Sequence, residues 1–317
     1  MGRPPRAIVL LGAQRFDPTL GEAVEELGVE GPIATITAGW QEREGEDADL
    51  HEHLQKRTVN LRLHRRAEDV WKRDPELAEG HRQKQQILRH KQDFYRIRLE
   101  HALDANHVIA QRKAPAAILE DEENASLQAI RLLDEYHLRQ CAKVEEDFEA
   151  AWRPRERPSI ERHRKEIAAV LRSCAGLGIA GGHVASLLNR LRLFGIEDLL
   201  DGHVLFAWTA GAMAISERVV LFHDSPPQGP GVAEVLDRGL GLCREIVPLP
   251  QPETRLRLDD AERVSVMARR FAPAACLAMP ARSRITLEAG AASHAHEIVR
   301  LRSDGTQTSV RSSQDLD

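Results

Sequence analysis

Residues 204–216 read VLFAWTAGAMAIS, and this segment is the most informative one about the fold class of the chain. Its first four residues form a continuous apolar run, which is typical of a strand buried on both faces of a parallel sheet. Ala210, Gly211 and Ala212 are small enough for a helix to begin close to that strand. Thr209 is therefore predicted at the apex of a nucleophile elbow, with backbone amides at a helix N-terminus beside it that can stabilise an oxyanion.

The same alternation of short apolar runs and helices extends on both sides of the elbow. Upstream, apolar strands are predicted at 7–11 and 33–37 around a helix at 19–27. Downstream, the predicted strands are 177–180, 204–207, 219–222, 233–239, 246–249, 275–279 and 284–287, with helices at 184–194, 210–216 and 260–271 and a terminal hairpin that turns at Asp304-Gly305. We therefore predict an α/β fold with a doubly wound, mostly parallel sheet.

Residues 51–165 differ in texture and are predicted to form a helical insertion. Gly80 is the only glycine between residues 50 and 165. Asp74-Pro75 combines an N-cap residue with proline at the first helical position. Apolar residues then recur every seven positions at Leu88, Tyr95, Ala102 and Ile109. Two long antiparallel helices, from about 75 to 112 and from 117 to 152, are expected to form a coiled-coil-like arm. The α/β domain would comprise residues 1–50 and 166–317.

The charges of the predicted arm are segregated between its two helices. Residues 51–113 contain fifteen Lys and Arg against nine Asp and Glu, whereas residues 120–150 contain three against ten. The two helices can neutralise each other, or a basic face can bind an anionic partner; we favour the first interpretation. Because narrow apolar stripes gain by pairing, we expect the arm to mediate self-association, as a homo-oligomer, or docking to a protein partner.

Composition excludes several classes of function. The net charge of −5 and the lack of aromatic residues among the arm's basic side chains argue against binding of nucleic acid. Four widely spaced cysteines form no CxxC pair, so we expect buried thiols and no disulfide framework or zinc site. No apolar run approaches the length of a membrane span, and the apolar run at the N-terminus is too short for a signal-peptide core. A cytoplasmic protein without a cofactor is expected.

Four separate segments, in the right order, resemble the cyanophycinase and dipeptidase E family of serine peptidases, whose fold is similar to that of class I glutamine amidotransferases. The W-S-A-G-A elbow of that family corresponds here to Trp208, Thr209, Ala210, Gly211 and Ala212. Its glycine-rich turn, which precedes a leucine-rich helix, corresponds to Gly181-Gly182-His183. The resemblance implies the amidotransferase-like fold, and it implies that the amides of Gly182 and Ala210 bind an oxyanion.

The remaining triad positions follow from the same resemblance. The acidic member, which comes after the next strand, corresponds to Asp224, and the histidine corresponds to Gln251 in the string Leu249-Pro250-Gln251. Thr209 thus stands in place of serine and Gln251 in place of histidine. Since an amide side chain cannot accept a proton as imidazole does, the resemblance implies a degenerate or rewired hydrolase triad.

Two hypotheses for function remain open from the sequence. In the first, the chain is a binding or assembly scaffold with a disabled triad. In the second, it is an active hydrolase of peptide or amide bonds, in which Thr209 attacks, His183 or His223 is the base and Asp224 orients that base. A purely structural interpretation of the same residues makes the histidines pocket-filling groups and Asp224 a loop cap.

Other candidate residues lie at the same predicted edge of the sheet or on the arm. Trp40, Gln41 and Glu42 follow the strand at 33–37, so we expect them, together with Trp208, to line the pocket. Two pairs with i, i+3 spacing, Asp104/His107 and Asp134/His137, can arise by chance in a charged helix, and no metal site is predicted.

Overall fold

The central sheet has seven strands within residues 3–223 and 232–316, the residues that a computed structural model of the chain describes. Their order across the sheet is β11-β10-β1-β5-β4-β2-β3. The strands are β1 (Ala7–Leu11), β2 (Ile33–Ile36), β3 (Thr58–Asn60), β4 (Gly176–Ile179), β5 (Val204–Trp208), β10 (Arg284–Glu288) and β11 (Ala291–His296). Neighbours from β1 to β3 are parallel, whereas β10 and β11 run antiparallel at one edge. The predicted α/β fold with a mostly parallel sheet is confirmed.

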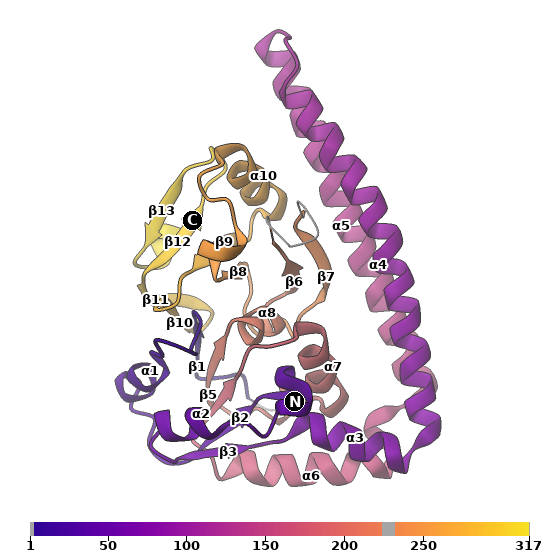
Figure 1. Ribbon diagram of the computed structural model, residues 1–317, viewed down its shortest axis with the longest axis vertical. Helices are drawn as coiled ribbons and strands as arrows, with labels where there is room; N and C mark the ends of the chain where they lie inside the picture. The colour runs from indigo at the N-terminus through magenta and orange to yellow at the C-terminus, as the bar shows by residue number, and fades with distance from the viewer. Residues whose placement is uncertain (1–2, 224–231, 317) are drawn as a thin grey trace.

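Both faces of this sheet are covered by helices (Figure 1). The covering helices are α1 (Leu20–Glu26), α2 (Ala48–His53), α3 (Leu63–Arg73), α6 (Pro158–Arg172), α7 (Val184–Phe194) and α8 (Ala210–Ile215). Val9 and Phe206 pack with α1, while Leu10 and Leu205 pack with α3, α6 and α7. Successive side chains of a strand point to opposite faces, so each central strand serves two cores. This is why these strands are continuous apolar runs in the sequence.

The strands after α8 do not extend the central sheet. In the described residues, β6 (Arg218–Leu221) and β7 (Glu234–Arg238) form an antiparallel pair. A four-stranded sheet has the order β13-β12-β9-β8 and contains β8 (Ile246–Pro250), β9 (Ala275–Met279), β12 (Ile298–Leu301) and β13 (Gln307–Val310), with α9 (Pro252–Arg255) and α10 (Ala261–Phe271) connecting β8 to β9. β10 pairs with β1 in antiparallel register and so occupies the edge of β1 at which β8 and β9 could otherwise have extended the central sheet.

The predicted pair of long helices is present as α4 (Pro75–Ala110) and α5 (Ala116–Trp152), which together we call the arm. The Asp74 carboxylate caps α4 by accepting a bond of 3.1 Å from the amide of Leu77, as the Asp-Pro pair predicts. Figure 1 shows the two helices running side by side along the α/β body, with their turn beyond it. At the base of the arm, Gly80 leaves room for the indole of Trp152, which a Cβ at position 80 would overlap.

The range 51–165 contains more than the arm. Thr58–Asn60 forms β3 and pairs in parallel register with β2, so these residues belong to the central sheet. The segment TVN is short, polar and only partly buried. It therefore carries no apolar run from which a strand could be predicted.

A buried hydrogen-bonded ion pair joins the arm to the body. Arg270 of α10 donates from Nε and Nη2 to the two carboxylate oxygens of Asp134 in α5, each at 2.7 Å. The hydroxyl of Tyr95 in α4 donates to the same carboxylate at 2.7 Å and accepts from the amide of Val235 in β7 at 3.1 Å. The side chains of Arg270 and Asp134 are 2% and 3% exposed. Four elements are thereby fixed by one set of charge-assisted bonds.

We expect Asp134→Ala to lower the free energy of unfolding by about 3–5 kcal/mol, because it leaves the Arg270 guanidinium buried without its counter-charge. Urea denaturation followed by circular dichroism measures this loss. Asp147→Ala on the same helix is the matched control, since Asp147 pairs with Lys143 on an exposed surface; it should change stability by less than about 1 kcal/mol. Equal effects of the two substitutions would contradict the importance of the buried pair.

His81 lies in an apolar environment at the base of the arm. Its ring is 4.7 Å from that of Trp71 in α3 and 6.2 Å from that of Phe148 in α5, measured between centroids. Burial, with the nearby charges of Lys84 and Arg190, lowers the pKa of His81 to about 3. The unfolded chain binds a proton at this residue near the ordinary pKa of 6.5, whereas the folded chain does not do so until about pH 3. Stability is therefore lost as the pH falls below 6.5.

When the pH is lowered from 7 to 5, protonation of His81 in the unfolded chain should reduce the free energy of unfolding by about 2 kcal/mol. His81→Phe and His81→Leu both remove the imidazole, so each variant should lose that much less stability over this pH interval than the wild type. Denaturation midpoints at the two pH values, at constant ionic strength, test the expectation. An unchanged pH dependence in both variants would show that His81 is protonated in the folded state.

No helix in residues 3–223 and 232–316 is long and apolar enough to cross a membrane. The two helices of the arm have sufficient length, but they carry charged side chains throughout.

Candidate functional site

Thr209 lies at the turn between β5 and α8 with a backbone conformation of φ 49° and ψ −119°. A positive φ is unusual for a β-branched residue and indicates a strained turn. The turn is close because α8 begins directly against the neighbouring strand: a Cβ on Gly211 would overlap the carbonyl of Ile179 in β4. The structure thus places Thr209 at the apex of an elbow, and the small residue at position 211 is a steric requirement.

The carboxyl ends of three parallel strands meet around this elbow. The amide of His183, after β4, donates to the carbonyl of Gly39, after β2, at 2.8 Å. Gly182 has a φ of 113° and also approaches Gly39 closely. A Cβ on Gly181 would overlap the hydroxyl of Thr209. The turns after β2, β4 and β5 therefore form one continuous surface at the edge where open α/β sheets bind ligands.

Two backbone amides on this surface have no acceptor. In the described part of the chain, the amides of Gly182 and Ala210 donate no hydrogen bond to another protein group. Ala210 is the first residue of α8, where the amides carry a partial positive charge. Ala210 is buried, whereas Gly182 is exposed. Each amide can donate to an oxygen atom from outside the chain.

The elbow opens into a cavity of about 780 Å³, which we call the elbow cavity. Seven of the predicted site residues line it: Trp40, Gly182, Trp208, Thr209, Ala210, His223 and Gln251. Gln251 is brought there by β8 and begins α9 with a φ of 57°. The Thr209 hydroxyl makes no hydrogen bond to any described residue, so no described imidazole is hydrogen-bonded to it.

Three other predicted residues lie outside the elbow cavity. His183 caps α7, its Nδ1 accepting from the amide of Ser186 at 3.2 Å and lying 3.0 Å from the Ser186 hydroxyl. Gln41 donates to that hydroxyl at 2.8 Å. Gln41 also has an elbow-like conformation, with φ 57° and ψ −123°. Glu42 is exposed and does not line the cavity. Asp224 lies outside the described residues.

The elbow cavity also contains charged residues that sequence reasoning missed. They are Arg15, Arg43, Glu46, Asp49, His53 and Arg255. Arg43 and Glu46 form an exposed ion pair at 2.6 Å. Burial lowers the pKa of the Arg255 guanidinium, and no described carboxylate lies within ion-pair distance of it. Burial likewise lowers the pKa of His53, whose Nε2 accepts from the amide of Gly21 at 3.0 Å.

Only part of this lining had a signal in the sequence. Arg15 follows the strand at 7–11 and so ends at the ligand-binding edge. His53 and Arg255 come from short helices, α2 and α9, whose positions depend on loops. No periodic pattern identifies such residues before the fold is known.

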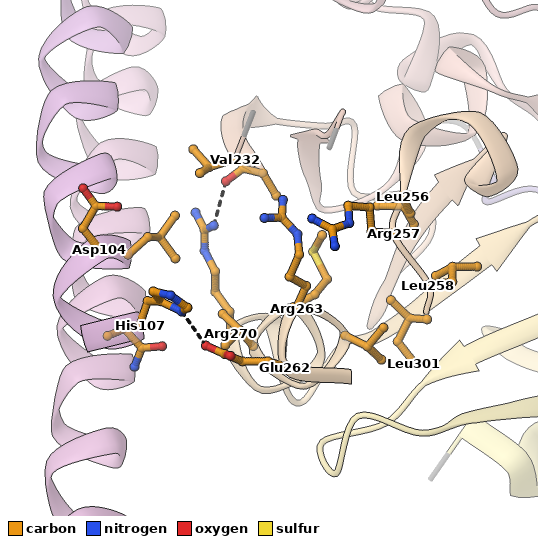
Figure 2. A pocket seen from close by; sticks show the side chains of 16 residues that line it. Asp104, His107, Val232, Leu256, Arg257, Leu258, Glu262, Arg263, Arg270 and Leu301 are labelled. Carbon is orange, nitrogen blue, oxygen red and sulfur yellow. Dashed lines mark hydrogen bonds and ion pairs between the residues drawn. The ribbon is translucent and has the colours of Figure 1, made fainter. Parts of the chain in front are cut away.

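A second cavity, of about 280 Å³, separates α4 of the arm from α10 of the body. Figure 2 shows His107 and Glu262 facing each other at one edge of it, with His107 Nδ1 2.8 Å from a carboxylate oxygen of Glu262. Arg270, which belongs to the buried ion pair, forms part of its wall. None of the predicted site residues lines this cavity.

The other reactive side chains have structural partners. In the described residues, no three His, Cys, Asp or Glu side chains are grouped so that they could hold a metal ion. Asp134 is bonded to Arg270, and His137 stacks on Tyr95 with 4.2 Å between ring centroids. All four cysteines are buried and unpaired. Burial raises the pKa of Cys243 to about 12, which keeps it a neutral thiol of the core.

Taken as a class, the geometry is that of an α/β protein with a strained strand-to-helix elbow beside a ligand-sized cavity. Comparison of the chain with known protein families finds no family that matches. Comparison with curated proteins also finds no match.

The strain at the elbow has a measurable consequence. Glycine adopts positive φ without steric cost, so Thr209→Gly should be more stable than Thr209→Ala by about 1 kcal/mol. Ser309, in the regular strand β13, provides the control, because there glycine should be less stable than alanine by about 0.5–1 kcal/mol. The denaturation midpoints of Thr209→Gly, Thr209→Ala, Ser309→Gly and Ser309→Ala measure these two differences in stability. Higher stability of Thr209→Ala than of Thr209→Gly would exclude backbone strain at the elbow.

Proposed function

We propose that this chain is a scaffold of the cyanophycinase and dipeptidase E type, with a class I glutamine amidotransferase-like fold. Its elbow cavity binds a peptide or amide group, its hydrolase triad is degenerate, and its arm docks a further copy or a protein partner. The observation that carries the proposal is the strained conformation of Thr209 beside two amides that lack acceptors, all at the wall of one cavity.

The position of the elbow supports the proposed fold. β5 pairs in parallel with β1 on one side and with β4 on the other, and it is the middle strand of the seven-stranded sheet, so the elbow follows the central strand. The glycine turn after β4 touches it directly. A central elbow next to a glycine turn is the arrangement that the resemblance to the peptidase family implies. The carbonyl of a bound peptide would accept from the amides of Gly182 and Ala210.

The surroundings of Thr209 support loss of hydrolysis. A hydroxyl has too high a pKa to attack an amide unless a neighbouring base removes its proton. Among the described residues, none is hydrogen-bonded to the Thr209 hydroxyl. Gln251, which lines the cavity from β8, holds the position that the resemblance assigns to histidine. Its side-chain amide can donate and accept hydrogen bonds but does not take up a proton.

One observation favours the alternative of a working hydrolase. Of the two candidate bases, His223 lines the elbow cavity with Thr209, whereas His183 is bonded to Ser186 outside it. In an active enzyme, His223 would therefore take the proton from Thr209. The reaction would cleave a peptide or amide bond through an acyl intermediate, which water then hydrolyses.

Hydrolysis of a panel of dipeptides and aspartyl peptides distinguishes the two functions. We expect no release of amine by the wild type above the rate in buffer, and release by the double variant Thr209→Ser/Gln251→His, because it restores a nucleophile and a base at two positions that line the same cavity. The matched control is Thr209→Ser/Gln251→Asn, which has the serine without an imidazole and should stay silent.

If the wild type hydrolyses a peptide of the panel and both Thr209→Ala and His223→Gln abolish this activity, the chain is an active hydrolase and the proposal of a degenerate triad is wrong. Silence of the double variant on every member of the panel would count against a peptidase-type cavity.

A further inference from the structure

The side of the arm that faces the body, which we call its inner face, packs against β6, β7 and α10. Tyr95, Leu99 and Ile130 are completely buried, and they share a core with residues of β6, β7 and α10. The seven-residue apolar repeat that includes Tyr95 therefore holds α4 against α5 and the body.

A second apolar stripe lies on the exposed side of the arm, and we call it the outer stripe. Its members, each between 42% and 66% exposed, are Ile87, Phe94, Ile97 and Val108 of α4 and Ile118, Leu132 and Tyr136 of α5. Ile87, Phe94 and Val108 lie seven and fourteen residues apart, the spacing of a helix face that packs along another helix. Single exposed apolar residues are common in soluble proteins, but seven large ones on the same side of two paired helices indicate a surface at which a partner binds.

Both helices contribute to one face. The guanidinium of Arg98 in α4 lies 5.1 Å from the ring centre of Tyr136 in α5. Gln92 and Arg96 on the opposite side of α4 are bonded to Glu234 of β7. The outer stripe is thus turned away from the contacts between arm and body, along helices that extend past the body at their turn (Figure 1).

The size of the outer stripe suits a dimer. Seven large residues that are about half exposed present roughly 700 Å² of surface in each copy, close to the area of about 800 Å² per partner in a standard interface. Two such arms in contact would form a four-helix bundle, the usual arrangement for helices with apolar residues at seven-residue spacing.

Charge selects the orientation of the two arms. α5 contains ten acidic against three basic residues, so two α5 helices would repel each other, whereas α4 contains six basic against five acidic residues. In an antiparallel pairing, Arg112 and Lys113 at the turn of one arm lie near Glu146 and Asp147 at the base of the other. The same surface then complements itself about a two-fold axis.

We propose that the outer stripe is the interface between two copies of this chain, with the arms antiparallel and α4 of each copy against α5 of the other. This inference rests on the proposed assembly role of the arm and assigns its partner and its contact face. The solution mass, measured by light scattering and sedimentation, should be twice the chain mass of 35.5 kDa.

Phe94→Glu and Leu132→Glu should each raise the dissociation constant of the dimer at least about 100-fold, since a charge would be buried at the centre of the interface. Phe16→Glu is the matched control: Phe16 is 91% exposed but lies outside the arm, and its replacement should leave the mass unchanged. Unchanged thermal melting of the monomeric variants establishes that they remain folded.

A charge exchange tests the orientation. Arg112→Glu should weaken the dimer several-fold, and Glu146→Lys in the same chain should restore it, since the two residues meet between copies. Failure of this rescue would overturn the antiparallel arrangement. If the wild type is dimeric and neither Phe94→Glu nor Leu132→Glu changes its mass, the proposed contact face is overturned but the assembly role is not. A wild type that is monomeric at about 100 μM would overturn the dimer, while docking of another protein to the arm and ligand binding at the elbow cavity would stand.

Discussion

The carboxylate of Asp134 is surrounded by donors from three other elements: the Arg270 guanidinium, the Tyr95 hydroxyl and, through that hydroxyl, the amide of Val235. A buried carboxylate is costly unless every oxygen is paired, so these four groups must come together for any of them to be tolerated. The position of the arm, the placement of α10 and the course of β7 all depend on this one condition. Conformational specificity of this kind does not arise from apolar packing alone.

The elbow cavity depends on a different constraint, the close approach of backbone at the ends of parallel strands. Gly39, Gly181 and Gly211 each touch backbone or hydroxyl atoms that a Cβ would overlap. The absence of side chains at these positions allows the three turns to approach one another closely. The site is therefore formed by main chain, with the side chains of Thr209, His223 and Gln251 around it.

The parts of the fold that were predictable are those in which one segment determines its own structure. The elbow at residues 204–216 was predictable because a buried strand followed by Ala-Gly-Ala leaves few alternatives, and α4 because Asp74-Pro75 marks its start. Strand β3 was not, since TVN becomes a strand only by pairing with β2. Likewise, His183 and His223 have similar positions in the sequence, each after an apolar strand. The structure shows that they face different surroundings, since His183 accepts a hydrogen bond from the amide of Ser186 whereas His223 lines the elbow cavity.

Two fixed points define the direction of the arm. Gly80 packs on Trp152 at its base, and Tyr95 is bonded to Asp134 fifteen residues further along α4. At a rise of 1.5 Å per residue these supports are about 22 Å apart, and α4 continues for about another 22 Å beyond the second. Further contacts hold this last part of the arm against α10: His107 of α4 lies 2.8 Å from Glu262, and Arg269 donates to Asn124 of α5 at 2.9 Å. A molecule bound at the turn of the arm would consequently be kept at a set distance from the elbow cavity.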